Sequence, residues 1–439
     1  MHRHYYIATM GCQMNEYDSD YLGQILQNSN YLPTTDPKKA DLILINTCTV
    51  RAKAEQKAYS LLGRMTALKK RKPHLVVGLT GCLAQQKGAS LLEAFPKLDL
   101  VLGPREIGGF QEILSKVVNR GERLAATDMD LEPVPPIKRP GYFVGHVKSY
   151  VSIMEGCNNF CTYCVVPYVR GKEVSRQPEE LIEEVQHLVR QGVKEITLLG
   201  QNVNSYFCGG EKAFGFTDLL RALDEVEGLK RIRFTTSHPK DLSDELIHCF
   251  GGLEHLCPHI HLPLQAGSNR VLKAMRRGYT REKYLDLIQK LKALRPGIAV
   301  TSDMMVGFPG ESDSDFKETL DMIRRIEFDN IYSFKYSDRE GTLAAKMKGK
   351  IPESEKSSRL SALQTLQRAI TLKKNRKLVG AIVEILVEGE SKRGGQLTGR
   401  TGTNKVVNFI SNYNSIGNLI NVMIKCAYAN SLWGERREG

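Results

Sequence analysis

Three closely spaced cysteines place the strongest constraint on how this chain folds and what it binds. Cys157, Cys161 and Cys164 follow the spacing Cys-x3-Cys-x2-Cys within residues 154–167. Thiolates this close together can hold three irons of a cubane iron–sulfur cluster, a cofactor that four cysteines ordinarily hold. No fourth cysteine follows nearby, so one iron is left open for a ligand from outside the protein. An open coordination position is typical of a catalytic metal site rather than a structural one.

The composition is that of a globular chain with more than one domain. Of the 439 residues, 41% are hydrophobic and 25% are charged, and this length predicts two or three domains. No apolar run reaches the roughly 18 residues that a membrane span needs, and the N-terminus lacks the apolar stretch of a signal peptide. We therefore expect a cytoplasmic protein without membrane contact. In that compartment ten cysteines indicate metal or redox chemistry rather than disulfide bonds.

The charge balance favours an anionic partner. The chain has 62 lysines and arginines against 49 aspartates and glutamates, which gives a formal net charge of +13. A basic balance of this size is compatible with nucleic-acid binding. A solvated basic surface without a partner is the alternative, and charge alone does not separate the two.

Residues 1–126 alternate short apolar runs with helical patterns. The expected strands are 5–8, 41–46 and 75–79, and the expected helices are 17–27, 51–70 and 89–95. This alternation predicts a small parallel α/β domain. Residues 127–144 then contain Pro133, Pro135, Pro136 and Pro140. A proline-rich stretch of this kind predicts an extended, semi-rigid linker.

Residues 145–378 repeat the strand–helix alternation over a longer segment. The expected strands are 151–154, 195–199, 231–235, 259–262, 299–305 and 330–334, and the clearest helices are 178–191 and 313–326. Six strands with intervening helices predict a parallel sheet curved into a partial (β/α)6 barrel. Functional groups of such folds gather beyond the carboxyl ends of the strands. The cysteine triplet follows the first of these strands, as that rule requires.

Residues 379–439 change in character and lose the helical patterns. Short β-like runs at 381–387, 397–400, 406–409 and 419–429 are separated by glycine and asparagine. This pattern predicts a small antiparallel barrel as a third domain.

A second set of cysteines lies in the first block. Cys12, Cys48 and Cys82 each follow an expected strand, so that a parallel sheet would bring them to one edge. Gly11 and Gly81 would let the backbone pass close to a bulky group. A single cysteine near a strand end is usually a small buried apolar residue. Three at equivalent positions predict a second cluster with one open iron.

The remaining cysteines show no such pattern. We interpret them as structural or incidental thiols: Cys208, Cys249, Cys257 and Cys426.

Several motifs together give the chain a family resemblance over its whole length. In the first block they are residues 9–15 (TMGCQMN), 46–51 (NTCTVR) and 81–85 (GCLAQ), and in the second 199–204 (LGQNVN), 236–239 (TSHP), 262–268 (LPLQAGS) and 306–311 (VGFPGE). With the cysteine triplet, they resemble the methylthiotransferases of the radical S-adenosylmethionine (SAM) superfamily. The resemblance implies an N-terminal methylthiotransferase domain, a radical SAM barrel and a C-terminal TRAM domain. Ala266 departs from the serine expected there, and we draw little from this conservative difference.

The resemblance also implies an activity and its cofactors. Residues 151–176 look most like the subfamily that methylthiolates C2 of N6-isopentenyladenosine at tRNA position 37, next to the anticodon. Such an enzyme carries two [4Fe-4S] clusters, one on Cys157, Cys161 and Cys164 and one on Cys12, Cys48 and Cys82. One SAM donates the methyl group and a second SAM yields the 5′-deoxyadenosyl radical. We expect no catalytic residue beyond these cluster ligands.

Other functions remain open from the sequence. One is the same chemistry on N6-threonylcarbamoyladenosine or on a ribosomal protein. The other is a non-enzymatic iron–sulfur or zinc protein that binds RNA. Two three-cysteine sets argue against closed zinc sites, because structural zinc takes four ligands.

Candidate SAM contacts follow successive expected strands of the second block. They are Tyr163, Gln201, Asn202, Ser237, Gln265 and Asp303. Their polar groups could supply the few convergent hydrogen bonds that a cofactor site needs. Each could instead cap a loop or a turn.

Candidate RNA contacts are basic residues of the second and third blocks. They are Arg276, Arg277, Lys392, Arg393, Arg400 and Lys405. Arginine and lysine would contact phosphates, and a solvated basic face is the alternative. The resemblance implies the tRNA anticodon stem-loop as the partner, together with an electron donor such as flavodoxin or ferredoxin, and we expect a monomer.

Overall fold

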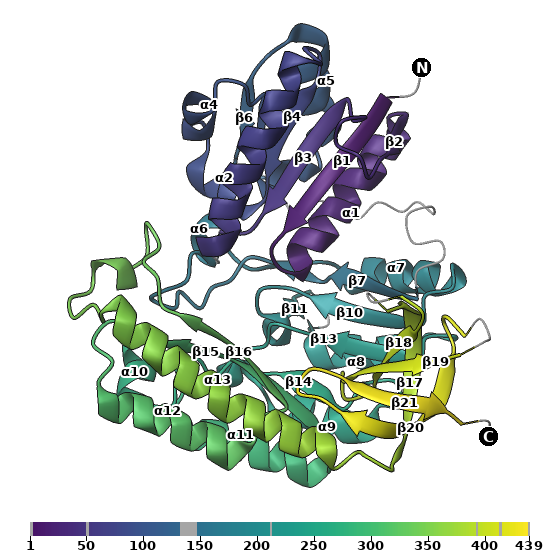
Figure 1. The fold of residues 1–439 in the computed structure, drawn as a ribbon, viewed down its shortest axis with the longest axis vertical. Coiled ribbons are helices and arrows are strands. Elements are labelled where there is room, and N and C mark those ends of the chain that lie inside the picture. The colour runs from purple at the N-terminus through teal and green to yellow at the C-terminus, as the bar shows by residue number, and fades with distance from the viewer. Residues whose placement is uncertain are drawn as a thin grey trace. The chain divides into compact units, whose positions relative to one another are not determined.

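The computed structural model describes residues 3–49, 52–131, 147–210, 213–391, 394–411 and 415–437. The chain divides into two compact units (Figure 1). The first unit is 1–142 with 155–158 and 164–174, and the second is 143–154 with 159–163 and 175–439. The division therefore passes through the cysteine loop. The prolines of the expected linker lie outside the described residues.

The first unit is built on a six-stranded parallel sheet, which confirms the predicted α/β domain. The strand order is β2-β1-β3-β4-β5-β6. The strands are β1 (Arg3–Met10), β2 (Tyr31–Pro33), β3 (Leu42–Thr47), β4 (Val76–Thr80), β5 (Leu100–Leu102) and β6 (Leu124–Ala126). The three strands expected from sequence correspond to β1, β3 and β4. The other three have only three residues each, too few to show a periodic pattern.

Helices cover both faces of this sheet. The helices of the first unit are α1 (Gln13–Asn28), α2 (Ala52–Ala67), α3 (Cys82–Lys87), α4 (Ser90–Ala94), α5 (Phe110–Arg120) and α6 (Val166–Val169), with 3-10 turns η1 (Leu68–Lys70) and η2 (Pro104–Ile107). Leu42 and Leu44 of β3 pack with α1 and α5, whereas Ile43 and Ile45 pack with α2, α3 and α4. Successive side chains of a strand point to opposite faces, so one continuous apolar run serves both layers.

The core of the second unit has the six strands expected of a partial barrel. Two parallel three-stranded sheets, β13-β10-β7 and β14-β15-β16, are formed by β7 (Lys148–Ser152), β10 (Glu195–Leu199), β13 (Arg231–Phe234), β14 (His259–His261), β15 (Ala299–Val306) and β16 (Asn330–Lys335). Single bridges extend the pairing, among them Gln265 with Met304. Short pairs add β8 (Met154–Glu155) with β9 (Val174–Ser175), and β11 (Phe207–Cys208) with β12 (Phe214–Gly215).

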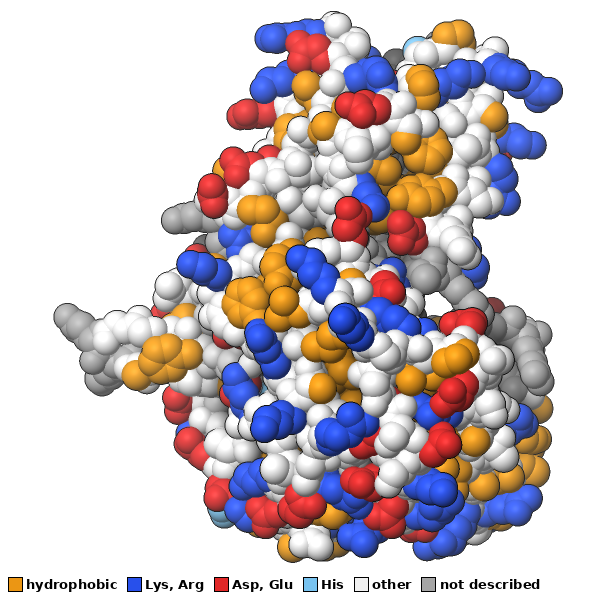
Figure 2. Space-filling model, turned by 90° about the vertical axis from the view of Figure 1, so that its left-hand side faces the viewer, with side chains coloured by type: hydrophobic (Ala, Val, Ile, Leu, Met, Phe, Trp, Pro, Cys, Tyr) orange, Lys and Arg blue, Asp and Glu red, His pale blue; other side chains and the backbone are white. Residues whose placement is uncertain are grey.

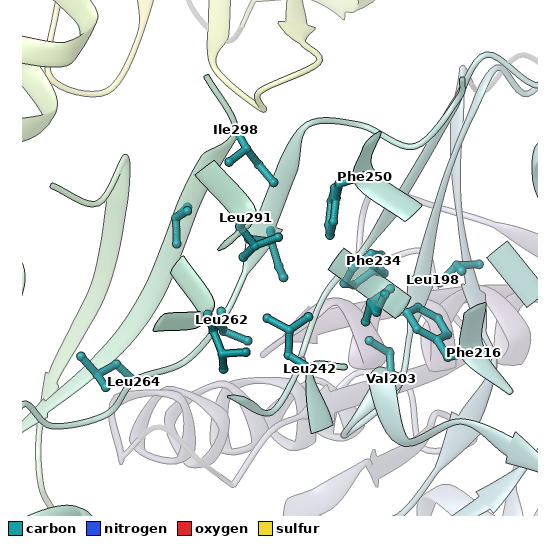
Figure 3. Close-up of a cluster of buried hydrophobic side chains, with 14 of the residues drawn as sticks. Leu198, Val203, Phe216, Phe234, Leu242, Phe250, Leu262, Leu264, Leu291 and Ile298 are labelled. Atoms are coloured by element: carbon teal, nitrogen blue, oxygen red, sulfur yellow. The ribbon is translucent and has the colours of Figure 1, made fainter. Parts of the chain in front are cut away.

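Helices alternate with these strands and enclose the core. They are α7 (Pro178–Arg190), α8 (Phe216–Asp224), α9 (Asp244–Gly252), α10 (Asn269–Ala274), α11 (Arg281–Leu294), α12 (Asp313–Ile326) and α13 (Glu353–Arg376), with η3 (Val203–Ser205), η4 (Pro239–Asp241) and η5 (Ala344–Lys346). The predicted helix at 313–326 is confirmed by α12. Ser312 caps its N-terminus, because the Ser312 hydroxyl accepts a hydrogen bond from the Asp315 N–H. Figure 3 shows Leu198, Phe234 and Leu262 meeting aromatic and aliphatic side chains of these helices.

The C-terminal residues of the second unit form a closed five-stranded barrel. Its strand order is β17-β18-β19-β21-β20, from β17 (Ile382–Glu390), β18 (Leu397–Thr401), β19 (Val406–Ile410), β20 (Leu419–Ala427) and β21 (Leu432–Arg436). The predicted small barrel is confirmed with one difference. β19 and β21 pair in parallel to close it, while the other pairs are antiparallel.

Buried arginines of the core hold this barrel. Arg231 of β13 donates a hydrogen bond to the Arg400 carbonyl at 2.6 Å. Arg233 donates to the carbonyls of Thr401 and Gly402, both at 2.8 Å. Charged donors to carbonyls give relatively strong hydrogen bonds. These bonds fix one turn of the barrel on the start of β13.

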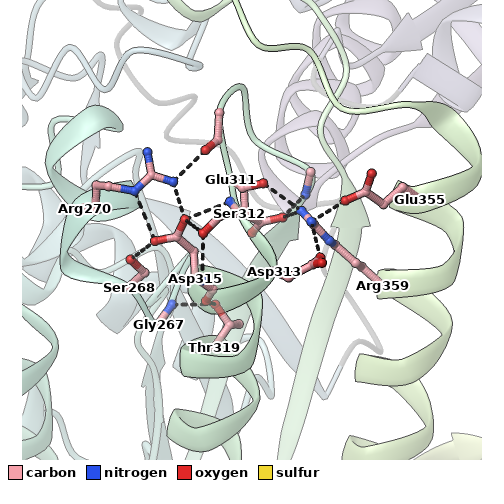
Figure 4. Close-up of polar contacts among 12 residues, drawn as sticks. Gly267, Ser268, Arg270, Glu311, Ser312, Asp313, Asp315, Thr319, Glu355 and Arg359 are labelled. Atoms are coloured by element: carbon pink, nitrogen blue, oxygen red, sulfur yellow. Dashed lines mark hydrogen bonds and ion pairs between the residues drawn. The ribbon is translucent and has the colours of Figure 1, made fainter.

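Two buried carboxylates after β15 are each held by an arginine (Figure 4). Asp315 accepts from Arg270 and from the hydroxyls of Ser268 and Ser312. Glu311 lies 2.7 Å from Arg359 of α13. Burial raises the pKa of Glu311, and the hydrogen bonds from Gly307 and Arg359 oppose that rise.

Replacing Arg359 should destabilise the core. We expect Arg359→Ala to lower the free energy of unfolding by about 3–5 kcal/mol, the range for breaking a buried ion pair, because it leaves Glu311 buried without a cation. Urea unfolding followed by circular dichroism measures the change. The deficit should shrink as the pH falls, since protonated Glu311 needs no cation.

The matched control is Arg368→Ala on the exposed side of the same helix. Surface changes of this kind are usually within about 0.5 kcal/mol of neutral. Equal stability of the two variants would contradict the role given to Arg359.

Candidate iron–sulfur and cofactor sites

The three cysteines of the first unit lie at the carboxyl ends of adjacent strands. Cys12 follows β1 and precedes α1, Cys48 directly follows β3, and Cys82 begins α3 after β4. The Cys48 N–H donates to the Met10 carbonyl at 3.0 Å, which ties the first two strand ends together. The structure thus places Cys12, Cys48 and Cys82 at one edge of the sheet, as the sequence predicts.

A pair of buried asparagines shapes the backbone between these cysteines. The Asn15 amide donates to the Asn46 carbonyl oxygen at 2.9 Å, and the Asn46 amide donates to the Asn15 backbone carbonyl at 2.9 Å. A Cβ at Gly81, where φ is +91°, would lie 2.4 Å from the Asn46 oxygen. A Cβ at Gly11 would lie 2.4 Å from the Asn15 oxygen. The two glycines therefore leave room for this asparagine pair, which a Cβ at either position would approach too closely.

A buried arginine supplies positive charge next to the thiols. Arg170 is 2% exposed and lies 2.5 Å from Asp18 of α1 and 3.4 Å from Glu155. Burial alone would lower the pKa of Arg170, but Asp18, Cys82 and Glu155 raise it well above the usual value. The guanidinium therefore stays charged. Arg105 holds the same segment by donating to the Arg170 carbonyl at 3.0 Å.

The thiols differ in how readily they ionise. A hydrogen bond with Cys48 lowers the pKa of Cys12 to about 6, and the Arg170 charge acts in the same direction. Burial raises the pKa of Cys82, which Arg170 opposes. A thiolate is the form that binds metal, so the positive charge favours ligation.

The donor set fits an iron–sulfur cluster better than a single ion. Among the described residues, no three His, Cys, Asp or Glu side chains are grouped closely enough to hold one metal ion. A cubane cluster does not require that grouping, because each thiolate binds a different iron. Soft thiolate ligands beside a buried cation suit an anionic iron–sulfur cluster.

The second set of cysteines lies on the loop after β8. Cys157 and Cys161 are buried, and Cys164 is half-buried. In the first unit the Cys157 N–H donates to the Gly171 carbonyl at 3.1 Å. In the second unit Thr162 beside Cys161 donates from its N–H to the Met275 carbonyl at 3.1 Å. Backbone hydrogen bonds thus order the loop at Cys157 and beside Cys161.

Three of the candidate SAM contacts have buried polar atoms that no described residue reaches with a hydrogen bond. Asn202 follows β10, Ser237 follows β13 and Gln265 follows β14, and all three are buried. Within the described residues, no hydrogen bond reaches Asn202 Oδ1, Ser237 Oγ or Gln265 Oε1. Gln265 also holds a φ of +71°. Unsatisfied polar atoms and strained backbone at a strand edge are typical of a ligand site.

The other candidates occupy less enclosed positions. Tyr163 is partly buried against the core, and its hydroxyl lies 3.5 Å from Arg277 Nη1. Gln201 is half-buried. Asp303 is half-buried and lies 3.4 Å from His261 Nε2.

His238 is a buried polar residue that the sequence analysis does not include among the candidate contacts. Burial lowers its pKa to about 2, with Arg277 and Lys240 contributing, so the ring is neutral. Nδ1 accepts from the Lys240 N–H at 3.2 Å, whereas no described residue contacts Nε2 by a hydrogen bond. Its position next to Ser237 in the motif at residues 236–239 is the sequence signal that could have placed it among the candidate contacts.

The structure corrects two of the candidate RNA contacts. Arg277 is buried and donates to the Pro263 carbonyl at 2.9 Å, so it cannot reach a phosphate. Lys405 is directed to the core, with Nζ 3.1 Å from Asp329 and 3.0 Å from Asn375. Local sequence does not reveal that a basic side chain is turned inward.

Of the other four candidate RNA contacts, the structure describes two. Arg276 is exposed, and Arg400 is partly exposed with Nε 3.2 Å from Glu388. Lys392 and Arg393 lie outside the described residues. Figure 2 shows lysine and arginine side chains spread over one face, with aspartate and glutamate side chains among them.

Family comparisons agree with this architecture. The radical SAM superfamily matches residues 151–323, and the TRAM domain matches residues 376–435. Residues 4–103 match a family described as uncharacterized protein family UPF0004. The chain is therefore a radical SAM protein, a class that uses a [4Fe-4S] cluster and SAM. The non-enzymatic alternative is set aside.

Relatives narrow the class to one family. A tRNA-2-methylthio-N(6)-dimethylallyladenosine synthase of Syntrophus aciditrophicus is 49% identical over 99% of this chain and 94% of its own length. The synthase of the same name from Geobacter sulfurreducens is 48% identical over 99% of this chain and 97% of its own. The chain belongs to the tRNA-2-methylthio-N(6)-dimethylallyladenosine synthase family of radical SAM methylthiotransferases.

Solved structures support the fold alone. The radical S-adenosylmethionine methyltransferase TsrM from Kitasatospora setae superposes with a TM-score of 0.57 at 15% identity, covering 79% of this chain and 74% of that chain. The radical enzyme OxsB superposes with a TM-score of 0.51 at 12% identity, covering 84% of this chain and 56% of that chain.

In the described part of the chain, no helix is both long and apolar enough to cross a membrane.

Removing one thiol of the first unit should change the metal content. We expect Cys48→Ala to lose roughly half of the iron and acid-labile sulfide of the anaerobically reconstituted protein, because one of the two clusters predicted from the sequence would lose a ligand. Exposed Cys426, in the C-terminal barrel, provides the control, and Cys426→Ala should keep the full content. Unchanged iron and sulfide in Cys48→Ala would rule out a cluster at this edge.

Proposed function

We propose that this protein methylthiolates C2 of N6-isopentenyladenosine at position 37 of tRNA. The observation that carries the proposal is 49% identity to a synthase of that name over 99% of the chain, all three domains included. The two sets of three cysteines support a transferase that needs two [4Fe-4S] clusters with open positions. When bound, these clusters would supply the electron that cleaves one SAM and the sulfur that a second SAM methylates.

The residues of the first unit would hold the sulfur-bearing cluster. Cys12, Cys48 and Cys82 are its ligands in this proposal. Arg170 would balance negative charge on the thiolates, since its guanidinium is buried next to Cys82 and stays protonated. The Asn15–Asn46 pair would hold the loops of Cys12 and Cys48 in register.

The residues of the second unit would bind SAM and orient it for cleavage. Asn202, Ser237 and Gln265 present polar atoms that no described residue satisfies, at the edge where such folds bind ligands. SAM would supply the missing partners. Tyr163, Gln201 and Asp303 would complete the site from the neighbouring loops. Enclosure by these residues would keep water from a reactive radical.

The tRNA would be recognised through its anticodon stem-loop. Arg276 and Arg400 are the described basic candidates for phosphate contacts, with Lys392 and Arg393 as further candidates. The target carbon is shielded by stacking, so the adenine would leave the loop to enter the site. An electron donor such as flavodoxin or ferredoxin would reduce the protein, which we propose acts as a monomer in the cytoplasm.

The remaining alternatives differ from this proposal only in the molecule that accepts the methylthio group. N6-threonylcarbamoyladenosine or a ribosomal protein would call for the same cofactors and the same cysteines. The relatives named above carry the dimethylallyladenosine name, and this favours isopentenyladenosine as the substrate.

Two cysteine variants should separate the two roles. We expect Cys161→Ala to abolish 5′-deoxyadenosine formation, because the electron cannot be delivered to SAM. We expect Cys12→Ala to keep cleaving SAM without inserting sulfur, because its defect lies at the other cluster. Chromatography of 5′-deoxyadenosine and of digested tRNA nucleosides measures both products.

Undiminished methylthiolation by Cys12→Ala would contradict the sulfur-bearing role. Loss of SAM cleavage in both variants would instead show that the two cysteine sets do not act separately.

A further inference from the structure

Arg277 is a buried cation with an unusual set of partners. It is 5% exposed and lies in the second unit, after α10. Nε donates to the Tyr279 hydroxyl at 3.0 Å, and Nη2 donates to the Pro263 carbonyl at 2.9 Å. Nη1 is directed at Cys161 Sγ, 3.4 Å away, and at the Tyr163 hydroxyl, 3.5 Å away.

No carboxylate balances this charge among the described residues. Arg170, Arg233 and Arg359 are buried too, and each forms an ion pair with a carboxylate. Arg105 has no carboxylate partner in the described part of the chain either, but backbone carbonyls accept from all of its N–H donors. A buried charge without an opposite charge is strongly unfavourable, so an anion is required near Nη1 of Arg277.

We infer that the anion is the Cys161 thiolate, and that Arg277 raises the reduction potential of the cluster held by Cys157, Cys161 and Cys164. The inference rests on the proposed function, which makes Cys161 a cluster ligand. Arg277 is then a positioning residue that acts through the sulfur, rather than a contact of the tRNA.

The direction of the effect follows from charge. Reduction adds one electron to the cluster and makes it more negative. A fixed cation and an N–H···S hydrogen bond stabilise the reduced form more than the oxidised form, which raises the potential. Cys161 and Arg277 are both buried, so water screens their interaction poorly.

The pattern of donors makes the role specific to arginine. Its planar fork reaches the carbonyl and the sulfur from the same buried position, whereas a lysine offers one compact charge. A lysine would therefore keep the charge near Cys161 but lose part of the directed hydrogen bonding.

The test is a potentiometric titration followed by electron paramagnetic resonance, without SAM or tRNA. The full-length chain with Cys12, Cys48 and Cys82 replaced by alanine would carry one cluster, so that its potential is assigned without ambiguity. Arg277→Gln and Arg277→Lys are compared with the exposed neighbour Arg276→Gln. Iron content is measured for every variant, and SAM affinity is measured separately.

We expect Arg277→Gln to lower the ratio of reduced to oxidised cluster roughly tenfold at a fixed potential, a shift of about 59 mV to more negative values for one electron. Arg277→Lys should shift it less, and Arg276→Gln should leave it unchanged. A full iron content with an unshifted potential in Arg277→Gln would overturn the inference. So would weaker SAM binding without a shift, which would make Arg277 a SAM contact.

Two further outcomes are informative. If Arg277→Gln binds no iron, Arg277→Lys must retain it, and equal loss in both variants would refute charge pairing. If the background that keeps Arg277 binds no cluster, the proposed function fails. If that background binds a cluster and Arg277→Gln leaves its potential unshifted, the inference alone fails, so the two failures are distinguished.

Discussion

The carboxyl ends of parallel strands are the constraint on which the candidate sites depend. In a parallel sheet every strand delivers its following loop to the same edge, so residues far apart in the sequence become neighbours. The first unit uses this edge for Cys12, Cys48 and Cys82, after β1, β3 and β4. The second unit uses the corresponding edges of its two sheets, for Asn202 and Ser237 after β10 and β13, and for Gln265 after β14.

Buried arginines recur next to the candidate ligands, and their surroundings differ. Arg170 lies near Cys82 and is compensated by Asp18 and Glu155. Arg277 lies near Cys161 without a carboxylate partner in the described residues. A cluster next to Arg170 shares that cation with two carboxylates, whereas a cluster next to Arg277 does not share its cation with any carboxylate of the described residues. The two environments are therefore suited to clusters of different potential.

Much of the architecture could be predicted from the sequence, since long periodic segments carry their own signal. The helix at 313–326 is correct at both ends, and Ser312 caps its N-terminus. The sequence does not predict β5 and β6, because a strand of three residues is too short to show a periodic pattern of side chains. The sequence does not predict the strand Leu432–Arg436, which follows closely on the longer run at 419–429 and pairs in parallel with β19 to close the barrel.

The candidate sites were predictable only where chemistry shows in the residue type. Cysteine spacing identified the thiols, whereas the burial of Arg277 and Lys405 depends on contacts distant in sequence. A basic residue therefore looks the same in sequence whether it faces phosphate, a carboxylate or a thiolate.

The most direct measurement is an anaerobic reaction of the reconstituted protein with SAM, a reductant and tRNA that carries isopentenyladenosine. Mass spectrometry of the digested nucleosides should show a new methylthio-isopentenyladenosine peak together with 5′-deoxyadenosine. Formation of 5′-deoxyadenosine without that peak would contradict the proposed acceptor or sulfur supply. Absence of both products from protein with intact clusters would contradict the radical mechanism itself.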